Sequence, residues 1–132
     1  MTPPTLPGHP HIAYRDGELC VEGVRVHALA QQYGTPLFVY SQASMRDALA
    51  AYQRGFAGRK VQICYAMKAN SSLALLQFFA RQGCGFDIVS GGELERVLAA
   101  GGDPGKVIFS GVGKTRAEMR QALRAGIRCF NV

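Results

Sequence analysis

The sequence lacks the paired cysteines from which zinc sites and disulfide frameworks are built. Its cysteines are Cys20, Cys64, Cys84 and Cys129. No two of them form a C-x-x-C pair, and none of the histidines stands at a metal-like spacing from them. We therefore predict no metal site. Cys64 and Cys129 lie in apolar runs, which predicts buried, reduced thiols.

Long apolar runs and dense basic runs are also missing. No stretch approaches the length of a membrane span, and the N-terminus is rich in proline instead of carrying the apolar region of a secretory signal. The net charge is +6, but lysine and arginine are scattered without interleaved aromatic residues, which argues against a nucleic-acid partner. We expect a cytoplasmic protein with neither a membrane nor a nucleic-acid partner.

The composition predicts a folded domain that follows a flexible N-terminal tail. Hydrophobic residues make up 48% of the chain and charged residues 18%, which excludes a disordered protein. Residues 1–11 hold four prolines and are expected to form a flexible tail.

A hairpin and a short helix are predicted next. The β-type pieces at residues 12–15 and 19–21 flank Asp16-Gly17, a pair typical of a tight hairpin turn. Residues 26–33 predict a helix that ends at a glycine.

Five short β-type runs alternate with helical stretches after Pro36. Strands that alternate with helices predict right-handed crossovers and a parallel sheet. No G-x-G-x-x-G sequence follows the first run, which favours a (β/α) barrel over an open dinucleotide-binding sheet. A complete barrel takes about 250 residues, so we predict an α/β fold with about the first half of a (β/α)8 TIM barrel. The runs are residues 37–40, 61–66, 86–89, 107–109 and 127–132, and the helical stretches between them contain Gln42, Leu73, Leu94 and Met119.

Lys68 directly follows the run at residues 61–66. In parallel α/β folds, ligands gather at the carboxyl ends of strands, where this amine is expected to lie. If the strand continues that far, Cys64, Ala66 and Lys68 share one face, and the small neighbours leave space for a cofactor ring. A lysine amine can attack an aldehyde. Position alone also fits a strand-end lysine that simply reaches solvent.

Asp87 lies one run later, between phenylalanine and isoleucine. A carboxylate with such neighbours is not fully solvated and needs a partner. Adjacent parallel strands would bring Asp87 near Lys68, which could be that partner. The alternative is an acid that caps a local turn.

Two glycine-rich segments follow predicted strands, and the first of them resembles a helix start. Ser90 and Glu93 match a capping box, and the same backbone could instead present N–H groups to an anion. The segment at residues 110–115, SGVGKT, is similar to a phosphate-binding loop. Its spacing is wrong because Ile108 stands where the first glycine of that motif belongs.

Four motifs occur in order along the chain. They are YAMKANS (residues 65–71), GFDIVSGGEL (85–94), IFSGVGKT (108–115) and FNV (130–132). Together they closely resemble the diaminopimelate decarboxylases, a family within the alanine-racemase-like pyridoxal phosphate enzymes. The resemblance extends from about Ile12 to the end of the chain.

The resemblance implies that Lys68 forms the Schiff base with pyridoxal 5′-phosphate and that Asp87 lies close to this cofactor. It implies decarboxylation of meso-2,6-diaminopimelate, a small-molecule amino acid, to L-lysine. It also implies a homodimer. Residues 12–35 would associate with a β-domain, and residues 36–132 would form an incomplete pyridoxal phosphate-binding barrel.

The family's ring-stacking histidine and glycine-rich phosphate loop have no counterpart in these residues. We therefore expect a truncated chain that is inactive and poorly stable alone. The alternatives are a decarboxylase of the same fold acting on ornithine, arginine or carboxynorspermidine, a non-catalytic pyridoxal phosphate-binding protein, or a short structural protein. The motif at residues 90–94 favours a truncated diaminopimelate decarboxylase over these alternatives. Residues 12–35 argue against the non-catalytic one, since such carriers lack the β-domain.

Overall fold

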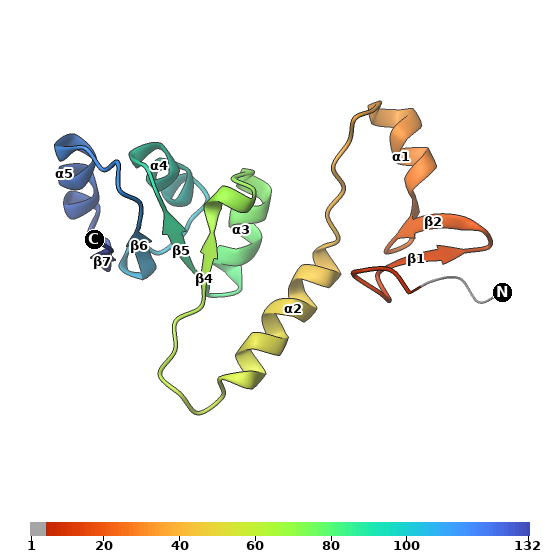
Figure 1. The fold of residues 1–132 in the computed structure, drawn as a ribbon, viewed down its shortest axis with the longest axis horizontal. Helices are drawn as coiled ribbons and strands as arrows, with labels where there is room; N and C mark the ends of the chain where they lie inside the picture. The colour runs from red at the N-terminus through yellow and green to blue at the C-terminus, as the bar shows by residue number, and fades with distance from the viewer. Residues whose placement is uncertain (1–4) are drawn as a thin grey trace. The chain divides into compact units, whose positions relative to one another are not determined.

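The structure is a computed structural model that describes residues 5–132. The predicted tail, residues 1–11, therefore lies partly outside the described residues. The chain divides into two compact units, with the boundary between Gly58 and Arg59 (Figure 1). Each unit is described by itself below.

The first unit contains a small antiparallel sheet. Its strands β1 (Ile12–Arg15), β2 (Glu18–Val21) and β3 (Val24–Arg25) pair in that order, and α1 (Val26–Tyr33) follows directly. The predicted hairpin is confirmed: Asp16-Gly17 has φ angles of 50° and 79°, the left-handed pair that a tight two-residue turn requires. The two-residue β3 was not predicted because it is too short to carry a pattern.

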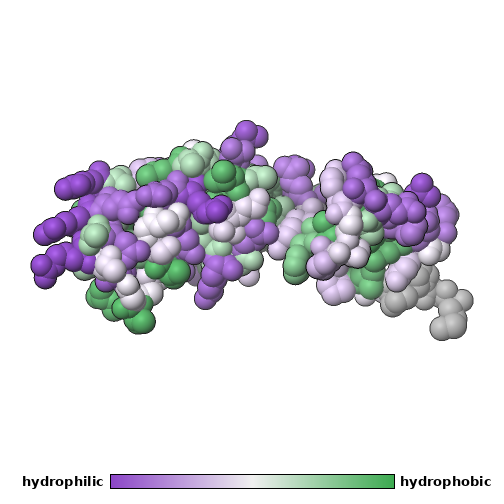
Figure 2. Space-filling model, turned by 90° about the horizontal axis from the view of Figure 1, so that it is seen from above, coloured by the Kyte–Doolittle hydropathy of each residue, from purple (hydrophilic) through white to green (hydrophobic). Residues whose placement is uncertain are grey.

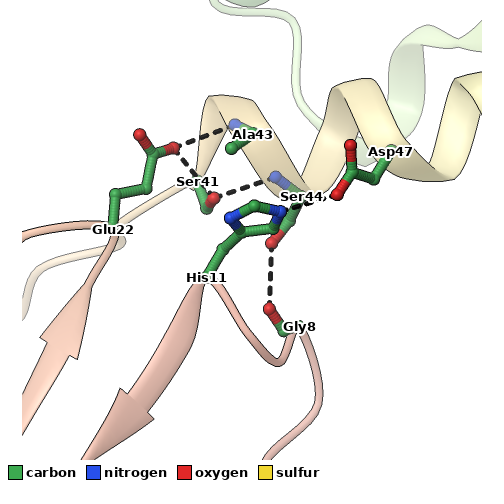
Figure 3. A network of polar contacts seen from close by, with 7 residues as sticks. All are labelled: Gly8, His11, Glu22, Ser41, Ala43, Ser44 and Asp47. Atoms are coloured by element: carbon green, nitrogen blue, oxygen red, sulfur yellow. Dashed lines mark hydrogen bonds and ion pairs between the residues drawn. The ribbon is translucent and has the colours of Figure 1, made fainter. Parts of the chain in front are cut away.

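Helix α2 (Gln42–Gly55) starts in a polar network with the hairpin (Figure 3). The buried Ser41 caps it, because its Oγ accepts a hydrogen bond of 3.0 Å from the Ser44 N–H. The Glu22 carboxylate accepts hydrogen bonds from Ser41 Oγ and the Ala43 N–H, both at 2.9 Å. The bond from Ala43, followed by that from Ser41, lowers the pKa of Glu22. The helix start and the turn after β2 are thus joined through one carboxylate.

Replacing Ser41 with alanine should destabilise the start of α2 by about 1 kcal/mol, since the cap and one donor to Glu22 are both lost. Hydrogen exchange of the α2 amides would measure this change. Ser44→Ala is the matched control, because the Ser44 hydroxyl only donates an exposed hydrogen bond to the Gly8 carbonyl. Equal protection in the two variants would contradict the capping role.

The predicted strand at residues 37–40 is wrong. This segment is irregular, and no strand of the described chain pairs with it. Phe38 is 87% exposed. A β-type sequence forms a strand only where a neighbour accepts its backbone hydrogen bonds, and that neighbour is missing within residues 5–132.

The second unit is a parallel sheet flanked by helices (Figure 1). Its strands run in sequential order, β4-β5-β6-β7. A sequential order is that of a barrel, whereas a doubly wound sheet reverses direction at its centre. The predicted α/β class and barrel arrangement are confirmed, with four parallel strands instead of five in the described part. The elements are β4 (Cys64–Ala66), α3 (Leu73–Arg81), β5 (Gly85–Ile88), α4 (Gly91–Ala99), β6 (Val107–Phe109), α5 (Arg116–Ala125) and β7 (Cys129–Phe130), with 3-10 turns η1 (Met67–Ala69) and η2 (Pro104–Lys106).

The two faces of this sheet differ. Side chains alternate along each strand, and one face holds fully buried residues that form the core together with apolar side chains of α3, α4 and α5. These strand residues are Phe86, Ile88, Val107 and Phe109. The opposite face, called the open face below, is formed by Cys64, Ala66, Asp87, Ile108 and Cys129, which the strand register places side by side.

The cysteine prediction holds only in part. Cys64 is half-buried, and this burial raises the pKa of its thiol. Cys129 is exposed, because it lies on the open face of the sheet. All four cysteines are free thiols in the structure.

The surface of both units is mixed. Figure 2 shows hydrophobic side chains in green between the hydrophilic ones, and the exposed apolar residues include Tyr33, Phe38, Val112 and Leu123. Across residues 5–132, none of the helices combines the length and apolar character needed to cross a membrane.

Candidate functional site

Lys68 lies in the 3-10 turn η1 at the carboxyl end of β4. The strand ends at Ala66, so the condition under which Lys68 would share a strand face with Cys64 and Ala66 is not met. Met67 is only 1% exposed and anchors the turn in the core, while Lys68 is exposed. The turn therefore presents the lysine at the edge of the sheet where ligands of parallel α/β folds bind.

Neighbouring side chains fix the chain around this turn. The Tyr65 hydroxyl donates a hydrogen bond of 3.0 Å to the Asn70 carbonyl, and its ring stacks on Phe79 with centroids 4.2 Å apart. Asn70 Oδ1 accepts from the Ser72 N–H at 2.9 Å, just before α3 begins. These contacts of Tyr65 and Asn70 were not predicted from the sequence. An asparagine two residues before the N-cap Ser72 is the signal that could have revealed the turn.

Asp87 lies on β5, where its register partners are Ala66 on β4 and Ile108 on β6. Its half-buried carboxylate accepts a hydrogen bond of 2.5 Å from Ser110 Oγ. The expected ion pair with Lys68 does not form among the described residues, so the partner of Asp87 is a hydroxyl instead of an amine. Ser110 was missed, although its place directly after β6 puts it beside the end of β5.

Side chains of the protein accept hydrogen bonds at the start of α4. Ser90 Oγ accepts from the Glu93 N–H at 3.2 Å, which confirms the predicted cap. The Glu93 carboxylate reaches one residue further back than a capping box requires and accepts from the Val89 N–H at 2.7 Å. The Gly91 N–H donates to Glu118 at 2.9 Å. The protein's own side chains therefore take N–H groups that were considered for an external anion.

In the glycine-rich segment after β6, the Lys114 amine is not directed towards a ligand as the lysine of a phosphate loop is. Lys114 Nζ donates to the carbonyl of Gly111 and, at 2.8 Å, to that of Asn131. It also lies 5.7 Å from the centre of the Phe109 ring, within the range of a cation–π contact. Lys114 thus ties the loop to the end of β7, in agreement with the rejection of a nucleotide-binding loop.

Known proteins share this fold and much of this sequence. Diaminopimelate decarboxylase from Pseudomonas aeruginosa is 58% identical over 120 residues, which cover 91% of this chain and 29% of that protein. The crystal structure of AQ1208 from Aquifex aeolicus superposes with a TM-score of 0.89 at 44% identity, covering 95% of this chain and 31% of the other. The diaminopimelate decarboxylase of M. jannaschii in complex with L-lysine gives a TM-score of 0.89 at 34% identity, covering 96% and 31%.

The chain spans less than a third of the length of these relatives. The pyridoxal binding domain of the pyridoxal-dependent decarboxylases matches residues 42–132, more than half of the chain. This match includes the lysine turn, the aspartate strand and both glycine-rich helix starts. The chain therefore belongs to the family of pyridoxal-dependent decarboxylases.

Proposed function

We propose that Lys68 is the residue that holds pyridoxal phosphate covalently and that Asp87 lies beside the bound cofactor. The observation that carries this proposal is the turn itself. It exposes one amine at the carboxyl end of β4 while Met67 and Tyr65 hold the backbone in place. A lysine that merely reached solvent would not need such support.

The open face beside the turn fits an aromatic cofactor. Ala66 keeps the last position of β4 small, and Asp87 stands opposite it on β5. The Ser110 hydroxyl donates to the Asp87 carboxylate, which holds this acid in one orientation. When bound, pyridoxal phosphate supplies a ring that accepts the electron pair left on the substrate by departing carbon dioxide. The protein's part is to bind, orient and exclude water.

We further propose that the substrate is meso-2,6-diaminopimelate and the product L-lysine. The high identity to the Pseudomonas aeruginosa diaminopimelate decarboxylase supports this substrate over ornithine, arginine or carboxynorspermidine. The M. jannaschii relative was crystallised with L-lysine, the product expected here. By the same resemblance, we propose a cytoplasmic enzyme that acts as a homodimer.

Chemical labelling tests whether Lys68 binds pyridoxal phosphate covalently. The chain is incubated with pyridoxal phosphate, reduced with borohydride and digested, and the modified peptide is identified by mass spectrometry. We expect the label on Lys68, its loss in Lys68→Arg, and no change in Lys60→Arg, which alters another exposed lysine. Label spread evenly over the surface lysines of the unaltered chain would contradict the assignment.

A further inference from the structure

Glu118 joins the starts of two helices. One of its carboxylate oxygens accepts a hydrogen bond of 2.9 Å from the Gly91 N–H at the start of α4. The other accepts from the Thr115 N–H at 2.9 Å and from the Thr115 hydroxyl at 2.7 Å, at the start of α5. A negative charge is stabilised at both places by the helix dipoles.

These contacts close a ring that contains Asp87 of the candidate site. Asp87 accepts from Ser110, and the Ser110 N–H donates to the Ile88 carbonyl at 2.7 Å, which ties the end of β6 to the end of β5. The chain continues from Ser110 to Glu118, and Glu118 returns to Gly91, four residues after Asp87. The loop after β6 is therefore fastened to β5 at its Ser110 end and to the start of α4 at its Glu118 end.

Resting on the function proposed above, we propose that Glu118 is a positioning residue that holds Ser110 against Asp87 and so fixes this acid beside the cofactor. Glu118 touches neither Asp87 nor Lys68 in the structure. It acts by closing the ring, so that the Ser110 hydroxyl cannot move away with its loop. Nothing in the resemblance to the decarboxylases assigns a role to this residue.

The proposed role of Glu118 requires a carboxylate side chain. A carboxylate can accept from all three donors, whereas a glutamine has one acceptor oxygen and an NH2 group that would face another donor. The bonds from Gly91 and then from Thr115 lower the pKa of Glu118 from 4.5 to about 2. The groups facing it are these N–H and hydroxyl donors, and no ion pair to it forms within the described chain. A depressed pKa means that the stabilisation is complete above about pH 4.5 and is lost as the pH falls towards 2.

The first measurement needs no cofactor. Hydrogen exchange of the Gly91 and Ser110 amides is compared between the chain and Glu118→Gln. We expect faster exchange at both amides by about threefold to tenfold at pH 5, with the difference vanishing as the pH falls towards 2. Glu95→Gln is the matched control, because it removes the same charge from an exposed acid on α4 that only accepts from Gln121.

A second variant, Gly91→Ala, disrupts the contact between Gly91 and Glu118 without changing any charge. A β-carbon on Gly91 would lie 2.6 Å from the Gln121 Oε1 and 3.0 Å from the Glu118 Cγ, so Gly91→Ala displaces both side chains. It should loosen the Ser110 amide as Glu118→Gln does. Ser110 protection unchanged in both variants would overturn the positioning role and leave Glu118 a local helix cap.

The second measurement is the rate of borohydride-trapped labelling at Lys68. We expect Asp87→Asn and Glu118→Gln each to slow it by about threefold to tenfold, and the double variant to be no slower than Asp87→Asn alone. Additive losses would show that Glu118 does not act through Asp87 and would overturn the proposal. Absence of label from the unaltered chain would instead overturn the proposed function, whatever the exchange at Ser110 shows.

Discussion

Replacing Lys68 with alanine is expected to lower decarboxylation about a thousandfold or more in an enzyme that contains this chain. Residues 12–132 can be inserted in place of the matching segment of the Pseudomonas aeruginosa diaminopimelate decarboxylase, to which they are 58% identical over 120 residues. The hybrid should release carbon dioxide and L-lysine from meso-2,6-diaminopimelate. The expected loss is large because alanine has no amine to hold the cofactor at the end of β4.

Lys60→Ala is the control in the same hybrid, because it removes another exposed lysine outside the turn. It should leave the rate unchanged. A Lys68→Ala hybrid with normal activity would contradict the catalytic assignment. A hybrid that decarboxylates ornithine but not diaminopimelate would contradict the proposed substrate but would leave the proposed role of Lys68 intact.

Replacing Phe86 with alanine should cost the second unit about 3 to 5 kcal/mol of unfolding free energy. Phe86 is fully buried in the middle of β5, and its register partners are Tyr65 on β4 and Val107 on β6. The smaller side chain leaves a cavity that a close-packed interior cannot fill without moving its helices. Since domains are stable by only about 5 to 15 kcal/mol, this loss should remove a large share of the stability of the unit.

The effect can be followed as hydrogen exchange of the Ile88 and Phe109 amides, which report on the same sheet. Val89→Ala is the control, because Val89 is 44% exposed at the end of the same stretch. We expect it to change stability by less than about 0.5 kcal/mol. Similar exchange in the Phe86→Ala variant and in the unaltered chain would contradict the placement of this ring in the core.

Elements with strong local signals could be predicted from the sequence. The helix at Val26–Tyr33 and the strand at Val107–Phe109 have the predicted bounds. A glycine follows the first, and the second is a compact apolar run between polar neighbours. The segment at residues 37–40 failed because its state depends on a partner strand, which no local pattern contains.

The candidate site was predictable in part for the same reason. The position of Lys68 after β4 follows from the order of strand and turn. The contact between Asp87 and Ser110 depends on the register between β5 and β6, which sequence order does not specify. Glu118 and Gly91 are 27 residues apart, and only the packing of α4 against α5 brings them together.

The alternation along β5 has a consequence for insertions and deletions. One extra residue inside β5, between Gly85 and Phe86, would exchange the two faces for the residues after it, so that the carboxylate of Asp87 would enter the layer of Phe86 and Ile88. The same event would place a phenylalanine ring where the acid now stands. Two extra residues would restore the parity of the strand. In this part of the gene, a change of a single codon in length would therefore damage the core and the site at once, whereas the loops between strands and helices can vary in length.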